Sequence, residues 1–137
     1  RRDIEDTIIP LAAERSLNIM AYAPLGGGIL TGKYREPPTF GKKDVRNFFY
    51  PFYQEPMWSR TQRLLETMRG IAERLDTAPA AIALAWAAAR PGITTVLAGA
   101  KNSDQAESNA AAADVALSEQ DVHALTASSD TILQESA

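Results

Sequence analysis

The sequence has no cysteine and only one histidine, His123, among its 137 residues. Without cysteine there is no disulfide framework, no thiolate zinc cluster and no cysteine nucleophile. A single histidine cannot build a metal site of several imidazoles. It could serve a triad only as the base, but no acid or nucleophile lies at matching spacing on its predicted helix. We therefore interpret His123 as a surface or partly packed residue, and the sequence predicts no metal ligands.

Long apolar runs and an excess of positive charge are also missing. No stretch approaches the ~20 apolar residues of a membrane span. No signal peptide is visible, because the chain runs from Arg1 into an amphipathic segment. The formal net charge of -3 argues against a nucleic-acid binder that relies on a positive field. We expect a cytoplasmic protein without membrane or nucleic-acid partners. The missing initiator methionine leads us to expect that the front of a longer chain is absent.

Two apolar segments predict strands. Residues 18–23 (NIMAYA) are bounded by Pro24, and residues 94–98 (TTVLA) are β-branched and apolar. Such short apolar runs are typical of strands that are buried on both faces of a parallel sheet. Residues 3–15 precede the first strand and carry apolar residues on one helical face. Because helical segments separate the two strands, we expect a parallel α/β arrangement with ligand-binding turns beyond the strand ends.

Helical spacing and capping signals predict the remaining elements. Apolar residues recur at helical spacing over 64–75, and Trp86 has the spacing of a core residue in the next helix. The segment 77–79 supplies a cap residue and a first-turn proline for that helix. Asn102 with Gln105 forms a candidate capping box, and Ser118 is placed to cap the last helix.

A long segment over 25–58 separates the first strand from these helices. It holds eight of the ten aromatic residues. Long loops are usually functional or disordered, and disordered segments are poor in aromatics. We therefore expect either a wall of a hydrophobic substrate pocket or a hydrophobic cover over absent neighbours.

The stretch GGILTGK at 27–33 has the spacing of a phosphate loop, but its surroundings argue against an ATPase. Tyr34 stands where a magnesium-binding serine or threonine is needed, and Gly99 follows the second strand instead of an acid. From spacing alone, the glycines are either a flexible strand exit or a turn that lets the backbone approach a ligand closely.

Three motifs resemble the aldo-keto reductase family. Residues 22–33 (YAPLGGGILTGK) are similar to its Y-S-P-L-G-x-G-x-L-T-G-K signature, and residues 83–86 (ALAW) are similar to a motif of one of its helices. Residues 98–109 resemble its P-G-A-[RK]-N-x-x-Q-x-x-E-N segment. The resemblance implies the C-terminal portion of a (β/α)8 TIM barrel, with about two βα units and the closing helices. It covers nearly the whole chain, so 1–137 is one partial domain.

The resemblance also implies part of an NADP site. The ring of Tyr22 would stack on the nicotinamide, and the backbone of Leu25, Gly26 and Gly27 would bind the pyrophosphate. In the second motif, Lys101 would meet the 2′-phosphate of the adenosine. The other residues implied there are Gly99 of the turn and the adenosine clamp of Asn102, Gln105 and Asn109.

Two departures and one absence limit what the resemblance implies. Ala23 lacks the family's usual hydroxyl, and Ser108 replaces its usual glutamate. The catalytic tyrosine, aspartate, lysine and histidine of the family have no matching segment, so we assign no catalytic residue. The expected function is the C-terminal part of an NADPH-dependent reductase of small-molecule carbonyls. The alternative is a non-catalytic assembly module that docks on itself or on the missing N-terminal part of the barrel.

Overall fold

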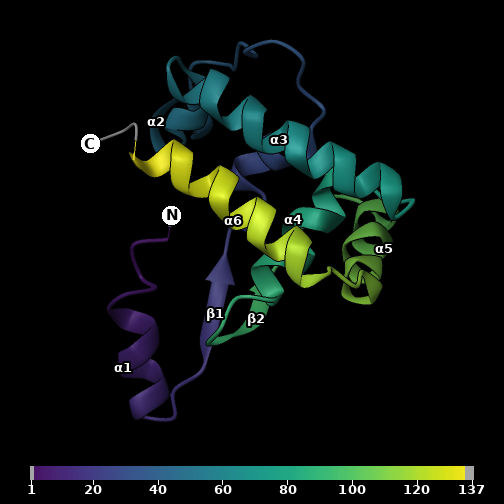
Figure 1. The fold of residues 1–137 in the computed structure, drawn as a ribbon. Helices are drawn as coiled ribbons and strands as arrows, with labels where there is room; N and C mark the ends of the chain where they lie inside the picture. Colours follow the sequence, from purple (N-terminus) through teal and green to yellow (C-terminus); the bar gives the residue numbers. More distant parts are fainter. Residues whose placement is uncertain (1, 135–137) are drawn as a thin grey trace.

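Two short parallel strands lie beside a group of helices in the computed structural model, which describes residues 2–134 and the side chains of 2–132 (Figure 1). The elements in chain order are α1 (Ile8–Glu14), β1 (Ile19–Tyr22), η1 (Gly26–Thr31), α2 (Arg46–Phe49), η2 (Pro51–Tyr53), α3 (Met57–Arg74), α4 (Pro79–Ala88), β2 (Ile93–Leu97), α5 (Ser103–Ala111), η3 (Ala112–Asp114) and α6 (Glu119–Gln134).

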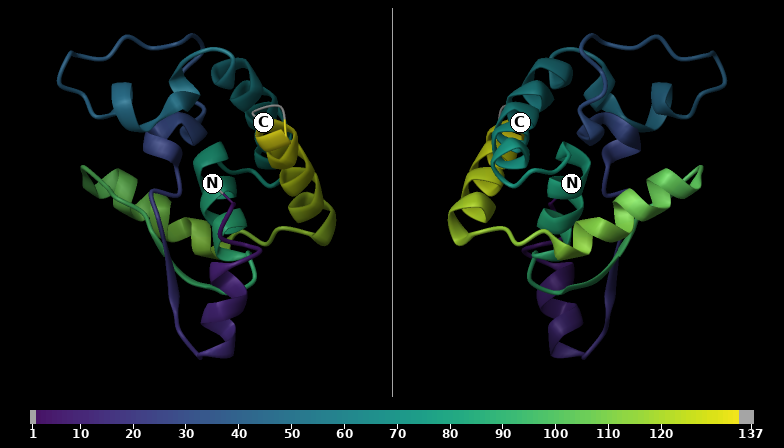
Figure 2. Two further views of the ribbon diagram at one scale, coloured as in Figure 1. Left: turned by 90° about the vertical axis from the view of Figure 1, so that its left-hand side faces the viewer. Right: turned by 90° about the vertical axis from the view of Figure 1, so that its right-hand side faces the viewer.

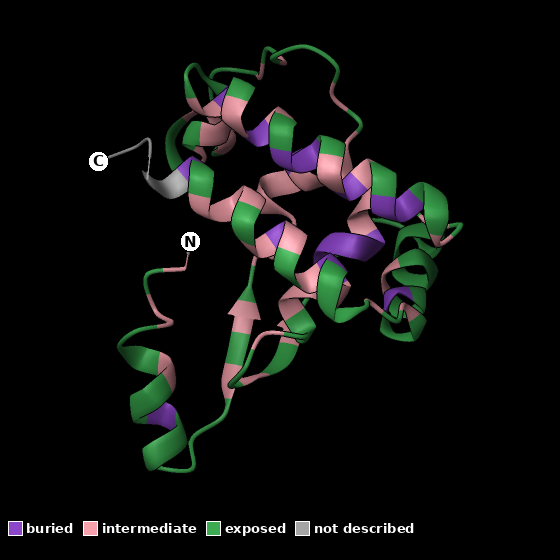
Figure 3. Cartoon of the chain, in the orientation of Figure 1, coloured by how far each residue is buried: buried purple, intermediate pink, exposed green. Residues whose placement is uncertain are grey.

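The two strands pair in parallel, as predicted. Ile19 is opposite Ile93 and Tyr22 is opposite Leu97, so both strands end at the same edge of the sheet. The short apolar runs are typical of strands buried on both faces in a full barrel, but in this chain one face of the pair is bare. Met20 is 63%, Tyr22 83% and Leu97 42% exposed. The physical reason is that α4 packs on the sheet, whereas the other face has no covering layer among the described residues (Figure 3).

The main core lies where α3, α4 and α6 meet. Figures 1 and 2 show these helices grouped together, while α1 and the strands extend from one end of the group. The core residues are Leu64, Leu65, Met68, Ile71, Ala72, Ile82, Ala83, Leu125 and Ile132. The helical periodicity over 64–75 therefore predicted the buried face of α3. Trp86 packs against this cluster but is only partly buried.

The predicted starts of the later helices are confirmed at two of three positions. The Asn102 side chain accepts a hydrogen bond from the Gln105 amide at 2.9 Å, and the Ser118 hydroxyl accepts from the Asp121 amide at 3.2 Å. A cap from Thr77 is wrong. The N-cap of α4 is Ala78 without a side-chain bond, because Thr77 closes the end of α3 by donating its amide to Ala72 at 2.9 Å.

The first helix is shorter than the predicted 3–15. It begins at Ile8, so that Pro10 occupies its first turn. Proline lacks an amide hydrogen and clashes with the carbonyl four residues earlier, so a helix cannot run unbroken through it from Asp3. Residues 3–7 form turns instead. His123 is exposed on α6, in agreement with its interpretation as a surface residue.

Candidate functional site

The structure brings the two glycine-bearing turns to one edge of the sheet. Tyr22 and Leu97 are the last residues of the paired strands and lie opposite each other. The turn that starts at Ala23 and the turn that starts at Ala98 therefore leave the sheet side by side. In open parallel sheets, ligands bind at this carboxyl edge. The two turns that carry the predicted cofactor residues are thus at the same end of the sheet. The predicted residues of these turns are Tyr22, Leu25, Gly26 and Gly27 in the first and Gly99, Lys101, Asn102 and Gln105 in the second.

The first turn needs glycine for its backbone shape. Gly26, Gly27 and Gly28 have φ angles of 57°, 69° and 100°, a region that other residues rarely adopt. A Cβ atom on Gly27 would lie 3.1 Å from the ring of Tyr50. The backbone is therefore both left-handed and closely packed here, and a substitution at Gly27 would displace it.

The turn itself uses one of the amides predicted to bind pyrophosphate. Gly26 donates its amide to the Ala23 carbonyl at 3.0 Å. The amides of Leu25 and Gly27 have no protein acceptor among the described residues. Of the three predicted backbone donors, Leu25 and Gly27 are therefore open to a ligand without breaking the turn. The stretch 27–33 leads into residues 33–45, which contain no helix, so it lacks the helix that follows a phosphate loop.

The aromatic segment, which comprises residues 34–58, packs onto this turn. Tyr53 donates its hydroxyl to the Gly27 carbonyl at 3.1 Å, and Ile29, Tyr53 and Trp58 form a second buried cluster. Burial raises the pKa of Tyr53 to about 12, so the hydroxyl keeps its proton and remains a donor at neutral pH. The segment is thus folded around the glycine turn, with α2 and η2 inside it.

An ion pair holds the outer part of the aromatic segment. Arg46 donates to both carboxylate oxygens of Asp44, at 2.8 and 2.5 Å, and to the Tyr34 hydroxyl at 3.0 Å. Its guanidinium also lies 3.9 Å from the centroid of the Phe40 ring. Hydrogen bonds from Arg46 lower the pKa of Asp44 from 3.8 to about 2.

We expect the aromatic segment to lose its fixed packing as the pH falls from about 4 to about 2. A carboxylate with a lowered pKa in the folded state stabilises that state above its unfolded pKa, and this contribution disappears as pH falls through the folded pKa. Near-ultraviolet circular dichroism of the tyrosines measures it. Asp44→Asn is the control, because it has no carboxylate to titrate. An identical acid transition in both proteins would contradict the assignment.

The second turn is held by the residues that resemble the adenosine clamp. Lys101 donates its amide to Gln105 Oε1 at 2.9 Å, and Asn109 donates its side-chain amide to the Gly99 carbonyl at 3.2 Å. The Lys101 side chain is exposed, and its charge helps to lower the pKa of Asp44. Gln105 and Asn109 therefore shape the turn. Among the described residues, the Lys101 ammonium forms no hydrogen bond to an acid.

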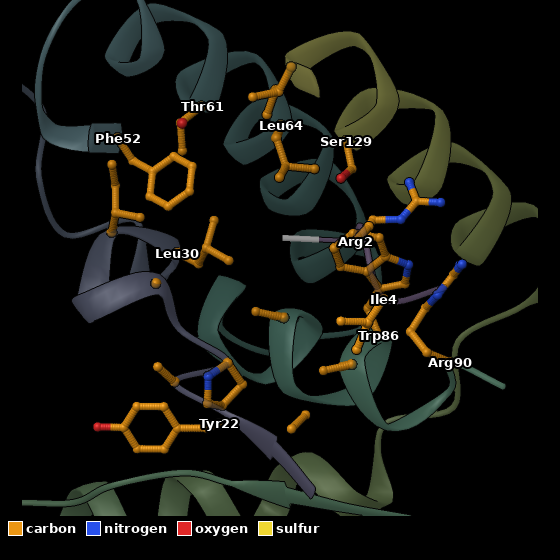
Figure 4. Close-up of a pocket in the computed structure, with 18 of the residues that line it drawn as sticks. Arg2, Ile4, Tyr22, Leu30, Phe52, Thr61, Leu64, Trp86, Arg90 and Ser129 are labelled. Atoms are coloured by element: carbon orange, nitrogen blue, oxygen red, sulfur yellow. The ribbon is translucent and has the colours of Figure 1, made fainter. Parts of the chain in front are cut away.

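A cavity of about 500 Å³ lies between the first turn and helices α3, α4 and α6 (Figure 4). Tyr22 lies at its lower end in that view, while Trp86 and Arg90 lie together at the other side. The Nε1 of Trp86 and the Nε of Arg90 are buried without hydrogen-bond partners. The walls are otherwise largely apolar.

An ionic cluster closes the polar side of this cavity. Glu5 accepts hydrogen bonds from Arg2 at 2.9 Å and from Arg90 at 2.8 Å, and Arg2 also donates to Asp130 at 2.5 Å. Hydrogen bonding to Arg2, together with the charge of Arg90, lowers the pKa of Glu5. Our sequence analysis did not identify this cluster. Its partners are up to 128 residues apart, and no local pattern links them.

Two further properties concern the described residues as a group. Within 2–132, no three histidine, cysteine or acidic side chains are gathered as a metal-ion site. Within the same part of the chain, no helix combines the length and the apolar character needed to cross a membrane.

Comparisons with known proteins identify the class. The chain folds as the C-terminal portion of a (β/α)8 barrel, with its two glycine-bearing turns at the carboxyl ends of the strands. The family model described as "Aldo/keto reductase family" matches residues 1–130. The chain therefore belongs to the aldo-keto reductase family, as its motifs predicted.

Individual relatives agree with this assignment. An uncharacterized oxidoreductase of Mycobacterium tuberculosis is 37% identical over 124 residues, covering 90% of this chain and 37% of that protein. The aldo-keto reductase str7 of Strobilurus tenacellus is 33% identical over 126 residues, with the same coverage of 90% and 37%. The solved glycerol dehydrogenase of Gluconobacter oxydans superposes with a TM-score of 0.82 at 27% identity, covering 98% of this chain and 39% of that one. The chain thus spans well under half the length of these relatives.

Proposed function

We propose that this chain forms the NADPH-binding C-terminal part of an aldo-keto reductase that reduces aldehydes or ketones to alcohols. The observation that carries the proposal is the meeting of two family motifs at one edge of the parallel pair. One motif offers an exposed aromatic ring at Tyr22, and the other offers the exposed cation of Lys101. We propose further that the chain lacks the catalytic tetrad and is inactive alone.

The residues present fit such a cofactor. In the left-handed glycine turn, a Cβ atom on Gly27 would crowd the Tyr50 ring. The turn brings the open amides of Leu25 and Gly27 close to any ligand at the strand end. Backbone amides in such turns bind phosphate oxygens. The ring of Tyr22 offers an apolar face to a nicotinamide. When bound, the cofactor would supply the hydride for reduction. These residues would bind and orient it.

Lys101 supports the choice of NADPH over NADH. It precedes the N-terminus of α5, where the helix dipole also favours an anion. Its side chain has no acid within ion-pair distance among the described residues. A 2′-phosphate at this place would gain a charge-assisted hydrogen bond.

We expect the chain to bind NADPH more tightly than NADH, and Lys101→Ala to remove the difference. Losing one hydrogen bond to a charged group weakens binding by roughly tenfold. Isothermal calorimetry with both cofactors measures it. Arg15→Ala is the charge-matched control, because Arg15 is exposed at the end of α1, before the start of β1, and both turns lie beyond the other end of the strands. Equal affinities of the wild type for the two cofactors would exclude the assignment of Lys101.

A non-catalytic assembly module remains the second candidate, and the exposed sheet favours it. Met20, Tyr22 and Leu97 present apolar surface from both strands. The strands form a two-stranded sheet among the described residues, so each has an open edge. Open edges with apolar side chains are templates for pairing with another chain.

We expect the chain to form dimers or larger assemblies, or to aggregate, unless a partner supplies the missing strands. Size exclusion coupled to light scattering measures this. Met20→Lys should shift the population toward monomer, because a charge on an exposed strand face opposes pairing. Phe48→Lys is the control, since Phe48 is 74% exposed on α2 and not on the sheet. A sharp monomer peak of the wild type, with a cooperative thermal transition and no binding of a hydrophobic dye, would contradict the expectation.

A further inference from the structure

A second, solvent-open cavity lies behind the glycine turn and shares no residue with the predicted cofactor site. Its volume is about 400 Å³. The walls come from three places, namely the end of η1, the second half of α3, and the link into α4. The lining residues are Thr31, Gly32, Lys33, Arg35, Arg69, Ala72, Glu73, Thr77 and Pro79.

The charge of this cavity has the opposite sign to that of the chain. Three cations, Lys33, Arg35 and Arg69, line it with one acid, Glu73, so three positive charges minus one negative charge give +2. The whole chain has a formal net charge of -3. An acidic protein that gathers three cations around one hollow creates a local positive field that attracts anions.

These three cations lack carboxylate partners within the described part of the chain. None of them forms an ion pair there. The Lys33 ammonium instead lies 4.8 Å from the centroid of the Tyr34 ring. The Nη2 atom of Arg69 is buried and has no hydrogen-bond partner. A buried donor without an acceptor costs free energy.

The walls of the cavity are fixed by packing. Gly32 has a left-handed backbone with φ of 71°, and a Cβ atom there would lie 3.5 Å from the Pro79 ring. The Thr31 hydroxyl donates to the Gly28 carbonyl at 2.7 Å. The two sides of the cavity, η1 and the start of α4, are therefore in contact before any ligand binds.

We propose that this cavity binds a small phosphate group, either inorganic phosphate or a phosphate monoester. The guanidinium groups of Arg35 and Arg69 can each donate two hydrogen bonds to phosphate oxygens. The Lys33 ammonium completes the charge balance from the glycine-turn side. A dianion would neutralise the excess of +2 around the cavity. This assignment is independent of cofactor binding by Tyr22 and Lys101.

The test is a calorimetric titration of the chain with inorganic phosphate at constant ionic strength. We expect saturable binding that Arg35→Gln and Arg69→Gln each weaken about tenfold. Arg35 is exposed, so its variant tests the site even if Arg69→Gln fails to fold. Arg15→Gln removes the same charge outside the cavity, and its binding should stay within about twofold of the wild type. Binding that does not saturate, or an equal loss in all three variants, would overturn the proposal.

Two further titrations separate the possible ligands. Glycerol phosphate that binds more tightly than inorganic phosphate would identify a monoester as the ligand, and the reverse order would identify free phosphate. A titration in the presence of saturating NADPH should leave phosphate affinity unchanged. If NADPH abolishes phosphate binding, the anion belongs to the cofactor site and the separate cavity site is wrong. If NADPH does not bind at all, the cofactor proposal fails, and the phosphate titration of the wild type and the arginine variants still decides whether the cavity binds phosphate.

Discussion

The purified chain is expected to oxidise NADPH no faster with aldehydes present than without them. Carbonyl reduction needs a proton donor of suitable pKa beside the substrate, and general acid catalysis contributes roughly 10²–10⁴-fold. The charged groups of the large cavity beside Tyr22 do not supply one. Arg2 and Arg90 are permanent cations. Glu5 stays ionised at neutral pH, because hydrogen bonds from Arg2 lower its pKa.

Tyr53, the buried tyrosine of the aromatic segment, does not change this expectation. Tyr53 already donates its hydroxyl to the Gly27 carbonyl, and burial raises its pKa to about 12. An activated tyrosine acid would need a lowered pKa and a free path to the carbonyl. Tyr53 has neither property.

The measurement is NADPH absorbance at 340 nm with a panel of aldehydes, with a full-length aldo-keto reductase as the positive control. Tyr22→Ala serves as the second arm. Oxidation by the wild type that Tyr22→Ala abolishes would contradict the prediction, because it would place a complete active site at the first turn. Oxidation that both proteins share would instead indicate a contaminating enzyme.

The sequence predicted those parts of the fold that depend on local patterns. Helical spacing over 64–75 identified the buried face of α3, because apolar residues at this spacing lie on one face of a helix whatever segment packs against it. Asn102 and Ser118 were found as caps because a capping bond spans only three residues. Both strands were found from short apolar runs ended by proline or glycine.

The exposure of the strands follows from the missing units of the barrel and not from the pattern of the strands themselves. An apolar strand is normally buried on both faces, but burial needs other segments to cover it. Met20 and Tyr22 are exposed because the described residues provide a layer on only one face. The start of α1 was missed for a local reason. The apolar spacing over 3–15 predicted a longer helix, but Pro10 confines the helix to residues from Ile8 onward.

In the candidate site too, local patterns predicted some features, and others depended on the folded chain. The positions of the two turns followed from the strands and the family motifs. The hydrogen bond from Tyr53 to Gly27, which joins residues 26 apart, and the cluster around Glu5 required the folded chain. No sequence pattern predicted that the Gly26 amide would donate a hydrogen bond to the Ala23 carbonyl within the turn. Such details depend on distances between segments, which residue spacing does not encode.

Leu65→Ala is expected to produce a large loss of stability. Leu65 is 0% exposed and lies in the main core with Met68 and Ile82. Removing a buried leucine side chain loses its transfer free energy and leaves a cavity, which together destabilise a protein by about 2–5 kcal/mol. Small domains are stable by roughly 5–15 kcal/mol in total. A change of this size would therefore remove a large part of the stability that α3, α4 and α6 provide.

Urea unfolding, followed by far-ultraviolet circular dichroism, measures the loss. Both variants and the wild type should be compared at one protein concentration, because association adds to apparent stability. Leu17→Ala is the matched control, since Leu17 is 61% exposed between α1 and β1 and its loss should change the free energy of unfolding by less than about 0.5 kcal/mol. If the two leucine variants unfold at the same urea concentration, Leu65 is not in a packed core. The grouping of α3, α4 and α6 would then not describe the protein in solution.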